Sequence, residues 1–121
     1  MPLKTATCFD KMKPFLKEQG ADVVKKVGFV YHFEVAESKG KEPTVWTVDL
    51  KNGSGSIQDG KQGKADATFA LIDQDAFDLF EGKLNPQNAF MQGKMKIKGN
   101  MQAAMKFTPD LFPKPKLWDD L

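Results

Sequence analysis

Side chains suited to nucleophilic, acid–base or metal chemistry are scarce in this chain. Its 121 residues include one histidine, His32, and one cysteine, Cys8. His32 alternates with apolar residues and falls on the same side as Glu34, which predicts a surface or sheet-edge position rather than a catalytic base. A metal site needs several converging ligands, and one histidine with one distant cysteine supplies too few. We therefore expect a protein that is not an enzyme and has no catalytic residue, metal or cofactor.

One segment partly matches a nucleotide-binding loop. Residues 55–61 (GSIQDGK) fit the first part of a P-loop, but Gln62 stands where a serine or threonine should hold magnesium. Asp59 would also repel a phosphate, so we interpret this segment as a hairpin loop. Acidic residues further along have a structural explanation, because Asp73 is placed as a helix N-cap and Asp75 in the first turn.

The overall charge argues against nucleic acid as a partner. Eighteen lysines, no arginine and sixteen acidic residues give a net charge of +2. This balance is unlike that of a nucleic-acid binder, and bidentate phosphate or base recognition favours arginine. The single Cys8 excludes an internal disulfide, fits a reducing compartment and is expected as a small buried hydrophobe. Without a signal-peptide core or an apolar run of ~20 residues, we expect an intracellular protein.

A basic stretch occupies the C-terminal half. Between Lys83 and Lys106 there are five lysines and no acidic residue. The usual interpretation is a solvated face. The functional alternative is a dock for a coenzyme A phosphate, or transient contact with an anionic membrane through Lys94, Lys96 and Lys98, each lysine adding ~1 kcal/mol.

The N-terminal region predicts two short helical pieces. Phe9, Met12 and Leu16 recur at helical spacing. Pro14 lies inside this pattern and should kink or restart the helix. Gly20 should end it, and residues 21–27 then form the second piece.

From Gly28 onward the apolar residues alternate, as is typical of strands. Phe29, Tyr31, Phe33 and Val35 share one face of the first strand. The elements predicted after it are strands at 44–50, 54–58 and 65–72, a helix from Asp73 to a stop at Gly82, a helix capped by Asn85 and closed by Gly93, a strand at 94–98, and a helix from its cap Asn100 to Pro109. This order predicts an α+β fold with helices on one face of a mainly antiparallel or mixed sheet.

Large, soft apolar side chains are concentrated in the C-terminal half. The members of this cluster are Phe69, Phe77, Phe80, Phe90, Met91, Met95, Met101 and Met105. An ordinary core is one interpretation of each residue, but together they favour an adaptable apolar pocket. Ten buried methylenes would contribute ~8 kcal/mol before association costs, enough to hold a hydrocarbon chain without a charged anchor.

Several segments carry a family resemblance. They are residues 23–27 (VVKKV), 46–55 (WTVDLKNGSG), 65–68 (ADAT), 82–87 (GKLNPQ) and 89–101 (AFMQGKMKIKGNM). With these segments in family order, the chain resembles the sterol-carrier-protein type-two domain, the non-specific lipid-transfer domain of animals. The resemblance implies a five-stranded mixed sheet covered on one face by helices, with a hydrophobic tunnel between them. It adds Trp46 to the expected lipid-binding residues.

The same resemblance implies a carrier of fatty acids, fatty acyl-CoA, sterols or phospholipids in the cytoplasm or peroxisome. Residues 1–108 should form the lipid-binding domain. Residues 109–121 form a proline-rich tail that departs from the family, and the chain ends Asp119-Asp120-Leu121 rather than in a peroxisomal tripeptide. The alternative function is a substrate-presenting or partner-docking module for lipid-metabolising enzymes, acting through this tail.

Overall fold

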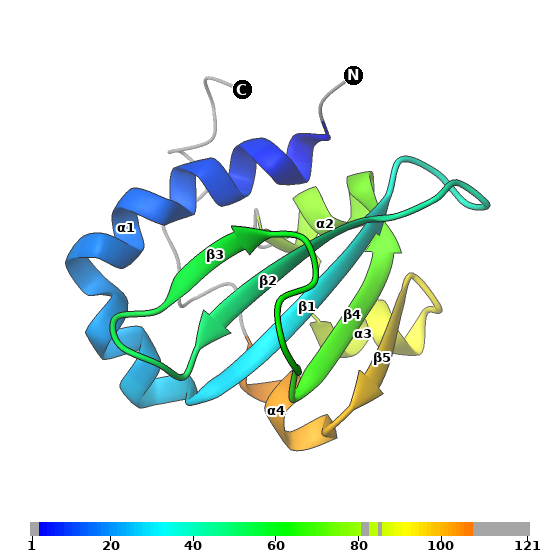
Figure 1. Cartoon of the computed structure of the whole chain (residues 1–121). Coiled ribbons are helices and arrows are strands. Elements are labelled where there is room, and N and C mark those ends of the chain that lie inside the picture. Colours follow the sequence, from blue (N-terminus) through cyan, green and yellow to red (C-terminus); the bar gives the residue numbers. More distant parts are fainter. Residues whose placement is uncertain (1–2, 81–82, 85, 108–121) are drawn as a thin grey trace.

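The alternating stretches form one five-stranded sheet in the order β3-β2-β1-β4-β5 (Figure 1). The computed structural model describes residues 3–80, 83–84 and 86–107. Its elements are α1 (Lys4–Val27), β1 (Phe29–Ala36), β2 (Thr44–Leu50), β3 (Ser56–Asp59), β4 (Ala67–Ile72), α2 (Asp73–Phe80), α3 (Pro86–Met91), β5 (Met95–Gly99) and α4 (Met101–Lys106). β1 pairs antiparallel with β2 and parallel with β4, while β2–β3 and β4–β5 are antiparallel. The predicted α+β class and mixed sheet are confirmed.

The predicted strand faces are also correct. Tyr31, Phe33 and Val35 point to one side of β1 and are fully buried there. Their register partners Val48 on β2 and Phe69 on β4 continue the same apolar face. Figure 1 shows the helices gathered on one side of the sheet, so helices cover this apolar inner face and not the opposite outer face.

The N-terminal region is one helix of 24 residues, so the helix does not restart at Pro14 and the predicted stop at Gly20 is wrong. A proline inside a helix costs ~3 kcal/mol because a backbone hydrogen bond is lost. The buried stripe nevertheless stays in phase on both sides of Pro14, from Met12 to Val23. Burial of that stripe outweighs the penalty, and the helix ends only at Gly28, which has the left-handed φ of 73°.

Gly20 has a packing role instead. A Cβ at this position would overlap the backbone carbonyl of Ser54, in the loop between β2 and β3. The missing side chain therefore lets α1 approach this loop closely.

Replacing Gly20 by alanine should destabilise the protein by about 1–3 kcal/mol, because the added methyl group overpacks the contact with Ser54. At an open helix position the same change would stabilise by up to ~1 kcal/mol. Urea unfolding measures the difference, with the exposed neighbour Gln19→Ala as control. A Gly20→Ala protein more stable than wild type would contradict this account.

The Asp73 carboxylate joins the two helices that begin at the same end of the molecule. It accepts hydrogen bonds from the backbone N–H groups of Lys4 and Thr5, both 2.9 Å long, and from the Thr5 hydroxyl at 2.7 Å. The prediction made Asp73 the cap of its own helix, but its carboxylate satisfies the start of α1. It thereby fixes α1 against α2.

The turn between β2 and β3 is built around Asp49. Its carboxylate accepts from the backbone N–H groups of Lys51 and Asn52 and from the Asn52 side chain. Partial burial acts to raise the pKa of Asp49, but these hydrogen bonds and the Lys51 charge outweigh it and hold the pKa below its usual value. The turn is therefore longer than predicted, and β3 begins at Ser56 rather than Ser54.

The outer face is partly covered by the connection from β3 to β4. These strands lie on opposite sides of β2 and β1, so the connection must cross both (Figure 1). Thr47 fixes this crossing by donating to the Gly60 carbonyl at 2.8 Å and accepting from the Gln62 N–H at 2.9 Å. His32 does share the outer face with Glu34 as predicted, but it is only 2% exposed, so its predicted surface position is wrong.

Two helix-end predictions, a stop at Gly82 and a cap at Asn85, lie outside the described residues, as does the tail from residue 109. The predicted cap at Asn100 is confirmed. Its side-chain oxygen accepts from the N–H groups of Gln102 at 2.8 Å and Ala103 at 3.2 Å.

Candidate functional site

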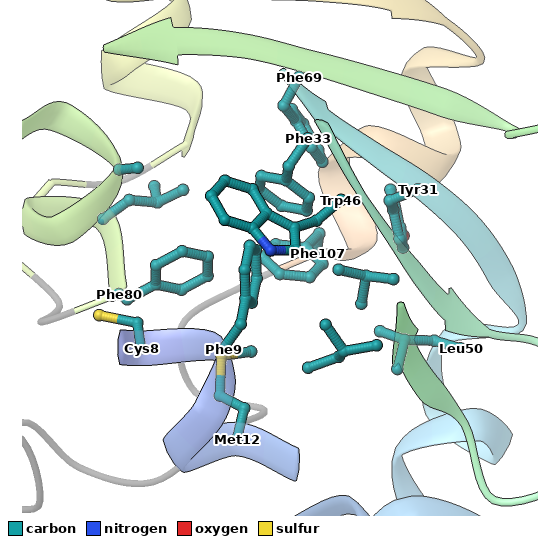
Figure 2. Close-up of a cluster of buried hydrophobic side chains, with 14 of the residues drawn as sticks. Cys8, Phe9, Met12, Tyr31, Phe33, Trp46, Leu50, Phe69, Phe80 and Phe107 are labelled. Carbon is teal, nitrogen blue, oxygen red and sulfur yellow. The ribbon is translucent and has the colours of Figure 1, made fainter. Parts of the chain in front are cut away.

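Aromatic side chains fill the space between the inner face and the helices (Figure 2). We call this group the aromatic layer. Its members are Phe9, Tyr31, Phe33, Trp46, Phe69, Phe80 and Phe107. Phe33 lies at its centre, with its ring centroid 5.0 Å from that of Phe69 and 5.1 Å from that of Phe107. The Phe9 ring centroid is 5.2 Å from that of Trp46, so α1 packs directly on β2.

The Tyr31 hydroxyl connects the sheet to α4. It donates a 2.5 Å hydrogen bond to the Ala103 carbonyl. Burial, together with the negative charge of Asp66, raises the pKa of Tyr31 above its ordinary value. The hydroxyl therefore stays protonated, and its donor holds α4 in place.

The residues expected to bind lipid fall into two groups. One group is buried between sheet and helices: Trp46, Phe69, Phe80 and Met95. Phe77 is half-buried at its margin, with the Lys4 ammonium 5.2 Å from its ring centroid. These side chains belong to a packed layer rather than to the wall of an open channel.

The second group is exposed on the two shortest helices. Phe90 is 44% exposed and Met91 73% exposed on α3, while Met101 and Met105 are each 44% exposed on α4. Among the described residues, these four are the exposed large hydrophobic side chains. Phenylalanine and methionine on a surface are typical of sites that bind apolar partners of variable shape.

Small side chains attach α3 and α4 to the sheet. α3 lies against β5, and the described residue it buries is Ala89. α4 lies against β4 and β5 and buries Ala103 and Ala104. Since alanines bury little area, displacing α3 costs less than displacing α1 or α2, whereas displacing α4 also breaks the Tyr31 hydrogen bond and disturbs the packing of Phe107.

Two cavities lined by described residues lie outside the aromatic layer. One of about 640 Å³ is on the outer face, and one of about 400 Å³ lies between α1 and β3. The expected tunnel would pass where the rings of Phe9, Phe33 and Phe80 contact one another, at centroid distances of 5.3–5.8 Å. A hydrocarbon chain can therefore lie beside the sheet only after a helix or one of these rings has moved.

Four members of the aromatic layer are not in the expected lipid-binding set: Phe9, Tyr31, Phe33 and Phe107. The alternation of β1 could have added Tyr31 and Phe33 to that set, because it places them on one apolar face, and the helical spacing of the N-terminal region could have added Phe9. Phe107 follows α4 in extended backbone, and no periodic signal marks it.

The single histidine and the single cysteine of the sequence are both buried. The His32 ring is buried beneath the outer loop, with Nε2 3.3 Å from the Gln62 carbonyl oxygen. Cys8 is buried, as predicted. Within residues 3–80, 83–84 and 86–107, no three His, Cys, Asp or Glu side chains gather to hold a metal ion. None of the described helices combines the length and apolar character needed to cross a bilayer.

Comparison with known proteins identifies the family. The model of the SCP-2 sterol transfer family matches residues 9–111. The chain therefore belongs to this family, and the resemblance inferred from its segments is confirmed.

Two relatives differ in the share of their own length that the chain covers. It is 46% identical over 115 residues to sterol carrier protein 2 of Arabidopsis thaliana, covering 93% of this chain and 94% of that protein. It is 44% identical over 103 residues to sterol carrier protein 2 of Rattus norvegicus, covering 85% of this chain but 19% of the rat protein. The chain thus spans nearly all of one relative and about a fifth of the other.

Solved structures share the fold. The apo form of sterol carrier protein 2 from Yarrowia lipolytica aligns with a TM-score of 0.76 and 33% identity, covering 86% of each chain. Sterol carrier protein 2 from Aedes aegypti, in complex with palmitate, aligns with a TM-score of 0.71 and 27% identity, covering 92% of this chain and 96% of that one.

The two groups of side chains should respond differently to truncation. Phe69→Ala should lower the free energy of unfolding by about 3–5 kcal/mol, because it opens a cavity in the aromatic layer. Phe90→Ala should lower it by less than about 1 kcal/mol, because the ring is half in solvent. Chemical denaturation measures both. A Phe90 variant as unstable as the Phe69 variant would assign Phe90 to the core.

Proposed function

We propose that the protein binds single lipid molecules and transfers them between membranes. The observation that carries the proposal is the exposed Phe90, Met91, Met101 and Met105, in a chain of the sterol transfer family. Apolar side chains in water favour any partner that covers them. The mosquito complex with palmitate supports fatty acids as one ligand class. Fatty acyl-CoA, sterols and phospholipids are the wider proposal.

The proposed ligand lies between the sheet and the two short helices. α3 moves outward, which is favoured by its small buried contact at Ala89, while the Tyr31 hydrogen bond and Phe107 keep α4 beside the sheet. The lipid then contacts the side chains of those helices and of α2, and the buried side chains form the floor beneath it. The proposed lipid-binding residues are Trp46, Phe69, Phe77, Phe80, Phe90, Met91, Met95, Met101 and Met105.

Burial of the hydrocarbon chain supplies the free energy for this displacement. Ten methylenes contribute ~8 kcal/mol, which is near micromolar affinity before the costs of association and helix movement. Flexible methionines adapt to chains of different shape, so selectivity for the hydrocarbon part is expected to be low.

Membrane contact is part of the same proposal. Lys94, Lys96 and Lys98 are exposed on and before β5, with no acidic residue in the surrounding sequence. They would attract an anionic bilayer surface, and raised salt would weaken that attraction. Cys8 is buried and, as the one cysteine of the sequence, cannot form an internal disulfide, which fits a reducing compartment, and we propose the cytoplasm or the peroxisome.

We further propose that this role is not catalytic. The one histidine is buried, and its Nε2 atom lies next to a backbone carbonyl rather than a nucleophile. A general base must reach the proton it removes.

Palmitate binding tests the proposal. Native mass spectrometry of the full chain should show a complex with one palmitate per chain. Phe90→Ala should weaken binding about tenfold, because a phenyl contact with the ligand is lost. Asn88→Ala, on the same helix, is the control and should bind as wild type does. A spectrum that shows only the apo protein at every palmitate concentration would refute the carrier function.

A partner-docking module is the second candidate. The observation that favours it is the rat relative, in which the matched region is about a fifth of a longer protein. Deleting residues 109–121 within the same experiment separates the two candidates. Palmitate binding and vesicle-to-vesicle transfer should persist if the tail docks partners, and should fall if the tail serves the lipid site.

A further inference from the structure

A groove on the outer face of the sheet is separate from the aromatic layer. It has a volume of about 640 Å³ and is lined by the ends of β1 and β4, by the β1–β2 loop and by the α3–β5 loop. We call it the outer groove. The charged residues that line it are Glu34, Lys39, Lys41, Asp75, Lys94 and Lys96.

The outer groove is positively charged. Its four lysines and two carboxylates leave a formal charge of +2 (4 − 2). Within the described residues, none of these lysines forms an ion pair shorter than 4.0 Å. Their ammonium groups are therefore available to an anionic ligand.

Lysines on opposite walls of the outer groove act electrostatically on one carboxyl group. Partial burial and the charge of Asp78 raise the pKa of Asp75, and the charges of Lys94 and Lys39 oppose that rise. Lys39 comes from the β1–β2 loop and Lys94 from the α3–β5 loop, so the charges of both walls act at one place. An anion there would interact with both lysines.

The floor of the outer groove is apolar. Ala36 on β1 pairs with Ile72 on β4, and Ala70 lies one step along the same face. This floor suits the carbon atoms of a ligand, while Glu34 and Asp75 can accept hydrogen bonds from its hydroxyl or amine groups. A volume of 640 Å³ is typical of small-molecule sites and far exceeds what a lone phosphate fills.

One wall of the outer groove continues into the exposed apolar surface. Gln92 and Gly93 line the groove, and the residue before them is Met91, which is 73% exposed at the end of α3. A single molecule can therefore place a charged end in the groove and an apolar end on α3.

We propose that the outer groove binds the phosphorylated head of an amphiphile whose hydrocarbon part lies against α3. The proposal rests on the proposed function, because it places the polar end of a carried lipid. A phosphate monoester carries a charge of about −1.5 to −2, which complements the charge of the groove. Lysine binds phosphate as a point charge, so the groove can accept different kinds of phosphorylated head group.

Three probes test this assignment by titration calorimetry on the full chain: dodecyl phosphate, dodecanol and glycerol 3-phosphate. The first two share a hydrocarbon chain, and the third is a phosphorylated head alone. Dodecyl phosphate should bind wild type at least about tenfold more tightly than dodecanol. Glycerol 3-phosphate should bind at least about tenfold more weakly than dodecyl phosphate.

Variants locate the phosphate. Lys39→Gln/Lys94→Gln should abolish the preference for dodecyl phosphate and leave dodecanol affinity within about twofold, because hydrocarbon contacts remain. Lys51→Gln/Lys61→Gln removes the same charge from exposed positions outside the groove and should preserve the preference.

The remaining outcomes overturn the assignment in distinguishable ways. If both dodecyl probes bind equally, or the Lys39/Lys94 variant keeps its preference, lipid binding stands and the groove is not the head site. If glycerol 3-phosphate binds as tightly as dodecyl phosphate, the groove holds free phosphate compounds rather than amphiphiles. If neither dodecyl probe binds, the proposed function fails as well.

Discussion

Ring-to-ring packing around Phe33 is the constraint on which the rest of the structure depends. This side chain contacts Phe9 of α1, Phe69 of β4, Phe80 of α2 and Phe107 after α4, with centroid distances of 5.0–5.8 Å. One residue of the central strand thereby fixes the positions of four other segments. Buried aromatic pairs contribute beyond their area alone. α1 and α2 are consequently held firmly, and the inner face of the sheet is closed along its middle.

The two short helices are held differently, and this difference is what makes lipid binding compatible with a packed interior. α3 and α4 bury alanines and expose Phe90, Met91, Met101 and Met105. We call α3 and α4 the cover of the proposed lipid site. α3 is held by a small buried contact, while Tyr31 and Phe107 keep α4 in place, so the proposed site needs no permanent open tunnel. Hydrocarbon burial can supply the free energy to move α3, while the aromatic layer keeps the fold intact.

Sequence patterns predicted the features that neighbouring residues determine. They did not predict the features that depend on contacts between residues far apart in the sequence. The alternation of apolar and polar residues assigned the faces of β1, because side chains of a strand alternate with a period of two. Asn100 could be recognised as a cap because it stands directly before its helix. The prediction for Gly20 was wrong because the role of this residue depends on its contact with the distant Ser54. The prediction for His32 was wrong because the strand order brings the β3–β4 connection over it. The outer groove combines side chains from β1, a hairpin loop, α2 and β5, which no single segment could reveal.

Hydrogen–deuterium exchange with and without palmitate tests the central claim most directly. The account predicts slower exchange at the amides of α3 and α4 in the complex, with little change in β1 and β4, because the cover closes on the ligand while the aromatic layer stays packed. Slower exchange in β1 and β4 with no change in α3 or α4 would contradict it, since the lipid would then act through the aromatic layer itself.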